Sequence, residues 1–266
     1  MKNIELNFPN KIKKMIEGKS YQLDNIGKSY SRVYIFDKMV LKVEKRNIQN
    51  DGTVAVMKAL EGKIPLPKVI CYEFDENYQY LLMSKINGKM ACDEYYLEHP
   101  EKLLHILADT LKMLWDLDIE SCPRIRDIDA ELIEAKYRVE NNLVDLNDVE
   151  PTTFSEGGFK NPLELLEWLK NNKPTYEPVV SHGDFCLPNI FIEDGKLSGL
   201  IDLGDMGIGD KWRDIALCYR SLRKNFDGSY GGKIYQNFNP DKLFEYLGIE
   251  PNYDKINYYL LLDELF

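Results

Sequence analysis

Residues 182–189 read His-Gly-Asp-Phe-Cys-Leu-Pro-Asn and lie between two short apolar runs, 179–182 and 190–192. A third apolar run, 197–201, is followed at once by Asp202 and Gly204. The turn Glu193-Asp194-Gly195-Lys196 joins the last two runs, which predicts a strand hairpin. Such a hairpin would bring Asn189 and Asp202 side by side at its open end.

The polar residues of this segment are of the types that phosphoryl transfer needs. One carboxylate must orient a hydroxyl and take its proton, while a second carboxylate and an amide oxygen hold Mg²⁺ on the phosphates. Asp and Asn are also common turn residues, so each of Asp184, Asn189 and Asp202 alone would suggest only a cap or turn. Their occurrence together, in this order and spacing, favours a site. We interpret His182 as a structural residue that hydrogen-bonds the loop, and Cys186 as a loop filler.

Composition excludes several classes of protein. The 266 residues contain 44% hydrophobic and 29% charged residues, typical of a folded chain with one large domain or two lobes. The net charge of −10 argues against nucleic acid or an anionic membrane as the main partner. We find neither an apolar run long enough to span a membrane nor a signal peptide. Five cysteines without a CxxC pair fit a reducing cytoplasm.

Hydrophobic patterning predicts a β-rich first third and a helical remainder. We expect a helix at 10–18, strand pairs at 33–36 with 39–43 and at 68–74 with 78–83, and a short helix at 53–60. Further helices are expected at 100–118, at 161–171 after an Asn-Pro cap, and from Asn239-Pro240 to Gly248. The predicted fold is α+β, with a small β-rich lobe over residues 1–86, a larger helical lobe over 87–266, and a ligand cleft between them.

The same segments carry a family resemblance. The loop, the hairpin and residues 210–216, Asp-Lys-Trp-Arg-Asp-Ile-Ala, resemble the aminoglycoside phosphotransferases, most closely the aminoglycoside 3′-phosphotransferases or kanamycin kinases. Residues 60–69 and the chain end, 258–266, resemble that subfamily too. The resemblance covers nearly the whole chain. It implies a protein-kinase-like fold and an enzyme that uses ATP or GTP with Mg²⁺ to phosphorylate an aminoglycoside hydroxyl, the 3′-hydroxyl, and so confers antibiotic resistance.

The resemblance also assigns roles to residues of the cleft. It makes Asp184 the catalytic base, Asn189 and Asp202 the Mg²⁺ ligands, and Lys42 a contact of the ATP α- and β-phosphates. Independently, a lysine inside an apolar strand needs an anion or a route to solvent. For the rest of the nucleotide it implies a phosphate-covering loop and a hinge whose backbone hydrogen-bonds adenine, with the candidates Ser29, Met83, Ser84 and Ile86.

The predicted acceptor is a polycation, so its pocket should be rich in carboxylates. We expect no nucleic acid, membrane or obligate protein partner. Acids at a helix C-terminus oppose the helix macrodipole, and a cationic ligand would resolve that conflict near the chain end. By resemblance, the candidates for this pocket are Glu150, Glu156, Arg220, Asp263, Glu264 and the α-carboxylate of Phe266.

Some positions depart from the family pattern. Thr53 stands where a helix glutamate normally pairs with the lysine, and Asp51 or Glu44 are the candidates to replace it. Asp205 stands where an arginine can occur, and Lys224 and Asn225 where acids can. Two alternatives therefore stay open. One is a kinase of another small hydroxylated or cationic metabolite, such as choline, an amino sugar or a macrolide, and the other is a nucleotide-binding pseudokinase.

Overall fold

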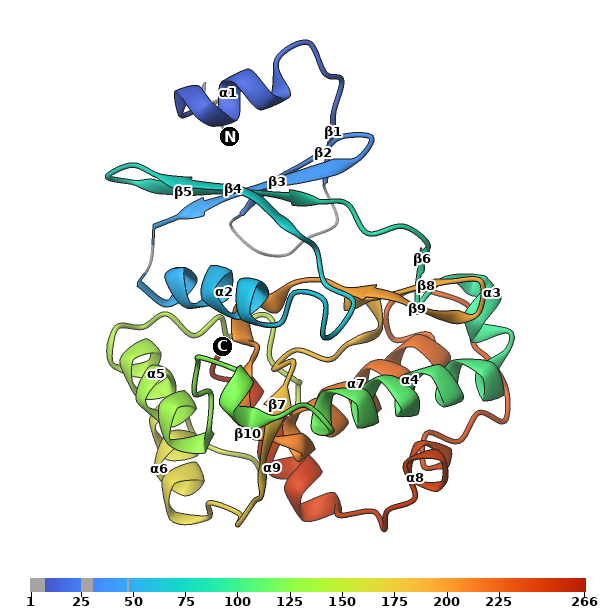
Figure 1. Ribbon diagram of the computed structural model, residues 1–266. Helices are drawn as coiled ribbons and strands as arrows, with labels where there is room; N and C mark the ends of the chain where they lie inside the picture. Colours follow the sequence, from blue (N-terminus) through green and yellow to red (C-terminus); the bar gives the residue numbers. More distant parts are fainter. Residues whose placement is uncertain (1–7, 25–30, 47) are drawn as a thin grey trace.

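A computed structural model describes residues 8–24, 31–46 and 48–266. Its upper part is a five-stranded antiparallel sheet in the order β1-β2-β3-β5-β4, with helix α1 on its outer face and helix α2 between the sheet and the lower helices (Figure 1). The bounds are α1 (Asn10–Ile16), β1 (Gln22–Leu23), β2 (Arg32–Ile35), β3 (Met39–Lys45), α2 (Ile48–Ala59), β4 (Val69–Phe74) and β5 (Tyr78–Ser84).

Strand β3 places its side chains alternately on the two faces of the sheet. Leu41 and Val43 are buried against the outer helix, in a cluster that includes Ile12 of α1 and Tyr80 of β5. Because successive side chains of a strand point to opposite faces, Lys42 projects from the other face, toward the lower part of the molecule. The alternation that builds the upper core therefore also aims a cation into the space beneath the sheet.

The lower part is mainly helical and holds the larger core. Helix α4 buries the stripe that its sequence predicts, including Leu103, Leu107, Leu111 and Leu114, at the centre of that core. The helices are α3 (Glu94–Leu97), α4 (Pro100–Trp115), α5 (Ile128–Glu140), α6 (Pro162–Asn171), α7 (Lys211–Phe226), α8 (Lys242–Leu247) and α9 (Tyr253–Asp263). Among the residues described, no helix is both long and apolar enough to cross a membrane.

Two small sheets lie among these helices. The predicted hairpin is present as β8 and β9, with Ile190 opposite Leu200, and β6 adds a third strand. Strands β7 and β10 form an antiparallel pair. The bounds are β6 (Lys89–Met90), β7 (Pro178–Ser181), β8 (Ile190–Glu193), β9 (Lys196–Leu200) and β10 (Gly207–Asp210). The mixture of strands and helices confirms the α+β class.

Most predicted elements occur, with shifted ends. The Asn161 cap is confirmed, because its side chain accepts a hydrogen bond from the Glu164 amide. The helix predicted from Asn239 is shorter, because the Asn239 side chain accepts from the Asp241 amide in a turn and α8 begins only after Asp241. The division into lobes at residues 86 and 87 stays a prediction.

Candidate functional site

The loop that precedes Asp184 is held by a buried carboxylate. Asp214, fully buried in α7, accepts hydrogen bonds from the His182 and Gly183 amides, both at 2.8 Å. His182 Nδ1 accepts from the Asp184 amide at 3.2 Å, and its Nε2 lies 3.0 Å from the Ile201 carbonyl oxygen, to which it donates in this tautomer. The prediction that His182 hydrogen-bonds the loop is thus confirmed, and the ring links the loop to the end of β9.

Asp184 and Asn189 lie in direct contact. Asn189 Nδ2 donates to Asp184 Oδ2 at 2.8 Å and to the Asp184 carbonyl oxygen at 3.0 Å. The Ile201 amide donates to the Asn189 carbonyl oxygen at 2.9 Å, so the residue before Asp202 is tied to Asn189. Because the side-chain nitrogen of Asn189 donates to Asp184, its side-chain oxygen Oδ1 can act as an acceptor for a ligand.

Asp202 reaches up to Lys42 of the sheet. Lys42 Nζ lies 3.0 Å from Asp202 Oδ1 and 2.7 Å from Glu44 Oε1. Burial acts to raise the pKa of Asp202, but the nearby Lys42 ammonium outweighs it and the pKa is lowered. Glu44 and Asp202 thus both pair with Lys42, and the side chain of Asp51, the other candidate, lies outside the described part of the structure. The Asp202 side chain is 48% exposed, which leaves it open to a ligand.

The carboxyl group of Asp184 is tuned toward proton exchange near neutrality. Burial raises its pKa to about 6, and the negative charges of Asp263 and Asp202 add to the rise while His182 opposes it. Since the group is ionised above that pH, it can accept a proton at neutral pH.

Cys186 lies in the same loop but is a poor nucleophile. Burial and the neighbouring Asp184 carboxylate raise the pKa of its thiol far above the ordinary range. The thiolate is the reactive form of cysteine, so this thiol stays protonated at neutral pH. The geometry agrees with a filling role in the loop.

The residues predicted to contact the nucleotide are partly brought together. Met83, Lys42 and Asp202 line one small cavity of about 60 Å³ beneath the sheet. Ser84 ends β5 with its amide donating to the Lys68 carbonyl oxygen at 2.9 Å. The Lys68 amide in turn donates to Ser84 Oγ at 2.8 Å.

Of the described residues predicted to contact the nucleotide, Ser84 and Ile86 do not line that cavity. Ile86 follows the sheet and packs against β9: a Cβ added at Gly199 would lie 2.7 Å from Ile86 Cδ1. Gly199 therefore leaves the space in which Ile86, on the segment that connects β5 to β6, packs against the hairpin. Ser29 falls outside the described residues.

The predicted acceptor residues gather at the chain end. Arg220 of α7 forms an ion pair with Asp263 at the end of α9, and Lys224, one turn further along α7, forms one with Glu150. The Glu150 amide donates to Glu264 Oε2 at 2.8 Å. The acids are therefore brought together, but two of them already face a cation of this chain.

The last residues are fixed by an arginine that the sequence did not single out. Arg138 of α5 donates from Nε to the Leu265 carbonyl oxygen at 2.8 Å and from Nη2 to Phe266 O at 2.5 Å. Glu156, another predicted acceptor residue, is exposed to solvent on the loop between Glu150 and α6. The sequence alone does not indicate that a single arginine in a helix binds a chain end more than a hundred residues away.

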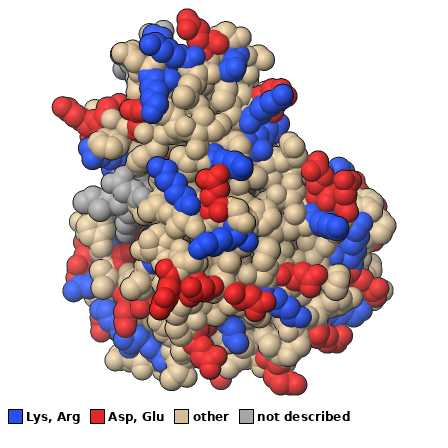
Figure 2. Space-filling model, in the orientation of Figure 1, with Lys and Arg blue, Asp and Glu red and all other residues tan. Residues whose placement is uncertain are grey.

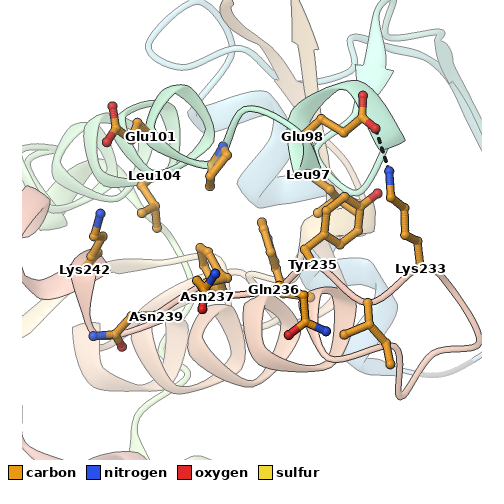
Figure 3. A pocket seen from close by; sticks show the side chains of 14 residues that line it. Leu97, Glu98, Glu101, Leu104, Lys233, Tyr235, Gln236, Asn237, Asn239 and Lys242 are labelled. Atoms are coloured by element: carbon orange, nitrogen blue, oxygen red, sulfur yellow. Dashed lines mark hydrogen bonds and ion pairs between the residues drawn. The ribbon is translucent and has the colours of Figure 1, made fainter.

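A larger cavity, of about 490 Å³, lies elsewhere (Figure 3). It is bounded by α3, α4 and the segment 233–239, with Lys233 paired to Glu98 at its edge. Its size would favour it as the ligand site. However, the carboxylates and the lysine that could support phosphoryl transfer lie around Asp184 and Lys42. The face shown in Figure 2 carries acidic and basic side chains intermixed, so surface charge does not mark a site on that face. We place the candidate site at Asp184 because of the residues gathered there.

Comparisons with known proteins identify the family to which the chain belongs. Residues 26–250 match the model of a phosphotransferase enzyme family. The chain is 38% identical to an aminoglycoside 3′-phosphotransferase of Enterococcus faecalis over 96% of this chain and 97% of the relative. It is 37% identical to one of Staphylococcus aureus with the same coverage.

Solved structures show the same architecture. Aminoglycoside phosphotransferase APH(3″)-Id of Streptomyces rimosus superimposes with a TM-score of 0.81 at 22% identity, covering 96% of this chain and 95% of that one. The same protein has been solved in complex with ADP and streptomycin. A type VIII aminoglycoside 3′-phosphotransferase gives 0.70 at 22% identity, covering 92% and 94%. These likenesses confirm the predicted two-lobed, protein-kinase-like fold.

Proposed function

Because the chain belongs to the aminoglycoside phosphotransferase family, we propose that it transfers the γ-phosphoryl group of ATP to the 3′-hydroxyl of an aminoglycoside antibiotic. The observation that carries the proposal is the linked pair of contacts at the site. Asn189 bonds Asp184, Lys42 bonds Asp202, and the Ile201 amide ties the two halves together. This supports an acceptor base and a phosphate-binding group working within one cleft.

The chemistry follows from the placement of the carboxylate. The acceptor hydroxyl donates a hydrogen bond to Asp184, its oxygen forms a bond to the γ-phosphorus, and the bond from that phosphorus to the β–γ bridging oxygen breaks. The hydroxyl proton passes to the Asp184 carboxylate and ADP leaves. Asn189 keeps the carboxylate oriented, and Lys42 holds the α- and β-phosphates.

The residues present fit a magnesium ion. The Oδ1 atom of Asn189 and the carboxylate of Asp202 are hard oxygen donors on adjacent segments, the kind that Mg²⁺ prefers. When bound, the ion neutralises charge on the phosphates. We propose that these two residues hold it, and that the nucleotide, ATP or GTP, is further contacted by Ser29, Met83, Ser84 and Ile86.

The chain end supplies the proposed pocket for the cationic acceptor. Arg220 of α7 pairs with Asp263 at the end of α9, and the Glu150 amide donates to the Glu264 carboxylate, so these acids lie together at the chain end. Asp263 and Glu150 are already paired with Arg220 and Lys224, so an amine-bearing ligand would share or displace these cations. We propose that these acids, the α-carboxylate of Phe266 and the loop acid Glu156 bind the ammonium groups.

The structure bears on the alternatives. The pseudokinase alternative rested on the missing helix glutamate, but Glu44 supplies a carboxylate 2.7 Å from the Lys42 ammonium. A different small hydroxylated acceptor would use the same cleft and is an outcome of the experiment below. We also propose a cytoplasmic location, which the five free cysteines support.

The test is ATP turnover with kanamycin and with its 3′-deoxy analogue. We expect kanamycin to raise ADP release well above background and the 3′-deoxy compound to leave it at background. The Asp184→Asn variant, nearly isosteric, is the matched control and should show no stimulation. No stimulation of the unchanged protein by any aminoglycoside, with turnover on another small alcohol, would overturn the acceptor assignment.

A further inference from the structure

Arg124 joins three segments at the back of the candidate site. It lies between the 3₁₀ turn Ile119–Ser121 and helix α5. Its Nε donates to the Met206 carbonyl oxygen at 2.7 Å, and its Nη2 donates to those of Gly204 at 2.9 Å and Leu203 at 3.2 Å. Three backbone acceptors of one short turn are thus held by a single guanidinium.

That turn, residues 203–206, directly follows the proposed metal ligand Asp202. The backbone of Asp202 has φ 55° and ψ 62°, a left-handed conformation that an aspartate adopts only at some cost. Such a conformation persists only where the surroundings determine it. The Arg124 bonds to the following carbonyl groups are an evident source of that constraint.

Arg124 also reaches helix α2 beneath the sheet. Its Nη1 donates to Thr53 Oγ1 at 3.3 Å, and a Cβ added at Gly52 would lie 2.9 Å from Arg124 Cδ. The side chain therefore fits against the helix at a position without a side chain of its own. Since α2 packs on the turn that carries Leu203, the arginine ties helix and turn together.

The arginine itself is firmly anchored. The Ile208 amide donates to the Arg124 carbonyl oxygen at 2.8 Å, and the Arg126 amide donates to that of Ile208 at 2.8 Å. These two bonds attach its backbone to β10, just after the turn. A planar guanidinium with several fixed donors can then set the turn rather than follow it.

We propose that Arg124 is a positioning residue that holds Asp202 in its metal-binding conformation and couples helix α2 to the same turn. The inference rests on the proposed function, in that it assigns Asp202 to Mg²⁺. Thr53 thus takes part in a link between α2 and the metal-ligand segment, in addition to the Lys42–Asp202 pair that links β3 to that segment.

The experiment measures Mg²⁺ and ADP binding by calorimetry, together with amide hydrogen exchange over residues 203–208 in the metal-free protein. Arg124→Met keeps the length of the side chain but removes its donors. We expect the Mg²⁺ concentration for half-saturation at fixed ADP to rise about tenfold or more, as when a residue that orients a metal ligand is lost. ADP binding in EDTA should stay within about twofold, and exchange of the turn amides should accelerate.

Two variants separate positioning from general destabilisation. Leu243→Ala weakens the fully buried core at α8, away from the site, and should leave the Mg²⁺ dependence and turn exchange unchanged. Arg124→Lys keeps the charge with a single donor head and should restore the Mg²⁺ dependence only in part. Wild-type Mg²⁺ dependence and turn exchange in Arg124→Met, or an equal change in Leu243→Ala, would overturn the proposal.

The outcomes also separate this proposal from the function on which it rests. If the unchanged protein binds no Mg²⁺–ADP, both are overturned. If it binds Mg²⁺–ADP and shows the Arg124 effect but phosphorylates no aminoglycoside, only the acceptor assignment is lost.

Discussion

Replacing Asp184 with asparagine should stabilise the free protein above neutral pH while removing its activity. Burial raises the pKa of Asp184 from 3.8 to about 6, so the charged form is disfavoured in the folded state. A rise of this size corresponds to about 3 kcal/mol at high pH, at about 1.4 kcal/mol per pKa unit. Partial exposure of the carboxylate reduces the expected gain to about 1–2 kcal/mol.

The sign and the pH window follow from linkage. Between about pH 4 and pH 6 the folded protein holds the Asp184 proton more tightly than the unfolded chain, so this group makes stability fall as pH rises. Above the folded pKa the loss is complete. Asparagine does not titrate, so its advantage over aspartate should grow by about 1–2 kcal/mol between about pH 4.5 and pH 7.5.

The assay is urea unfolding of both proteins, in EDTA and without nucleotide, at the two pH values. The Asn189 amide can still donate to the asparagine oxygen, so the variant keeps the local hydrogen bond. Kinase activity of the wild type should fall as pH drops through about 6, because the base becomes protonated. A stability difference that does not change with pH would refute the assignment of a raised pKa to Asp184.

Three further substitutions test other contacts. Glu44→Gln should raise the KM for ATP about fivefold to tenfold with little change in kcat, because Lys42 loses the carboxylate that holds it at 2.7 Å; steady-state kinetics with Leu243→Ala as control measures this. Lys224→Ala should tighten aminoglycoside binding about threefold to tenfold by freeing Glu150, and the gain should shrink at about 0.5 M NaCl; calorimetry decides. Arg138→Ala should raise the KM for the aminoglycoside about tenfold and leave that for ATP within about twofold, because the chain end is released.

Each has a contradicting result. An unchanged KM for ATP in Glu44→Gln would mean that Asp202 alone sets the position of Lys42. Weaker drug binding in Lys224→Ala would show that the lysine supports the pocket instead of opposing its ligand. Equal losses for both substrates in Arg138→Ala would indicate a general folding defect.

Local patterns allowed much of the fold to be predicted. The loop of Asp184 and Asn189 and the hairpin that follows are short-range features, encoded by turn residues between apolar runs. The leucine stripe of α4 has the period of a helix and lies in the core as expected. Such elements need no knowledge of what they pack against.

Other features depend on distant partners and were not predicted. Asp214 is charged, which favours a position facing solvent, yet it is buried in helix α7. It is buried because its carboxylate accepts hydrogen bonds from backbone amides 31 and 32 residues earlier in the chain. Strand β10 contains two glycines, which usually disfavour a strand. They are accommodated because the backbone of a distant segment passes close to the strand: a Cβ added at Gly209 would lie 2.6 Å from the Arg126 carbonyl oxygen.

The site residues also differ in whether local sequence patterns or distant partners determine them. The sequence offered two candidates for the acid partner of Lys42, and strand geometry places one of them, Glu44, on the same face as Lys42, where the two pair. The side chain of Asp51, the other candidate, is not described. Arg124 and Arg138 carried no signal, because their acceptors are backbone carbonyl groups whose positions no side-chain pattern encodes. Arg220 was a candidate by resemblance, but its pairing with Asp263 follows from the packing of α7 on α9, and the pairing of Lys224 with Glu150 also depends on tertiary structure.

The most direct test of the central claim is a ³¹P–¹H correlation spectrum of the product formed from kanamycin, ATP and Mg²⁺. The account predicts one phosphate whose phosphorus couples to the proton on the 3′ carbon, formed by the unchanged protein and absent with Asp184→Asn. A phosphate on another carbon, or the same product from the asparagine variant at an undiminished rate, would contradict it.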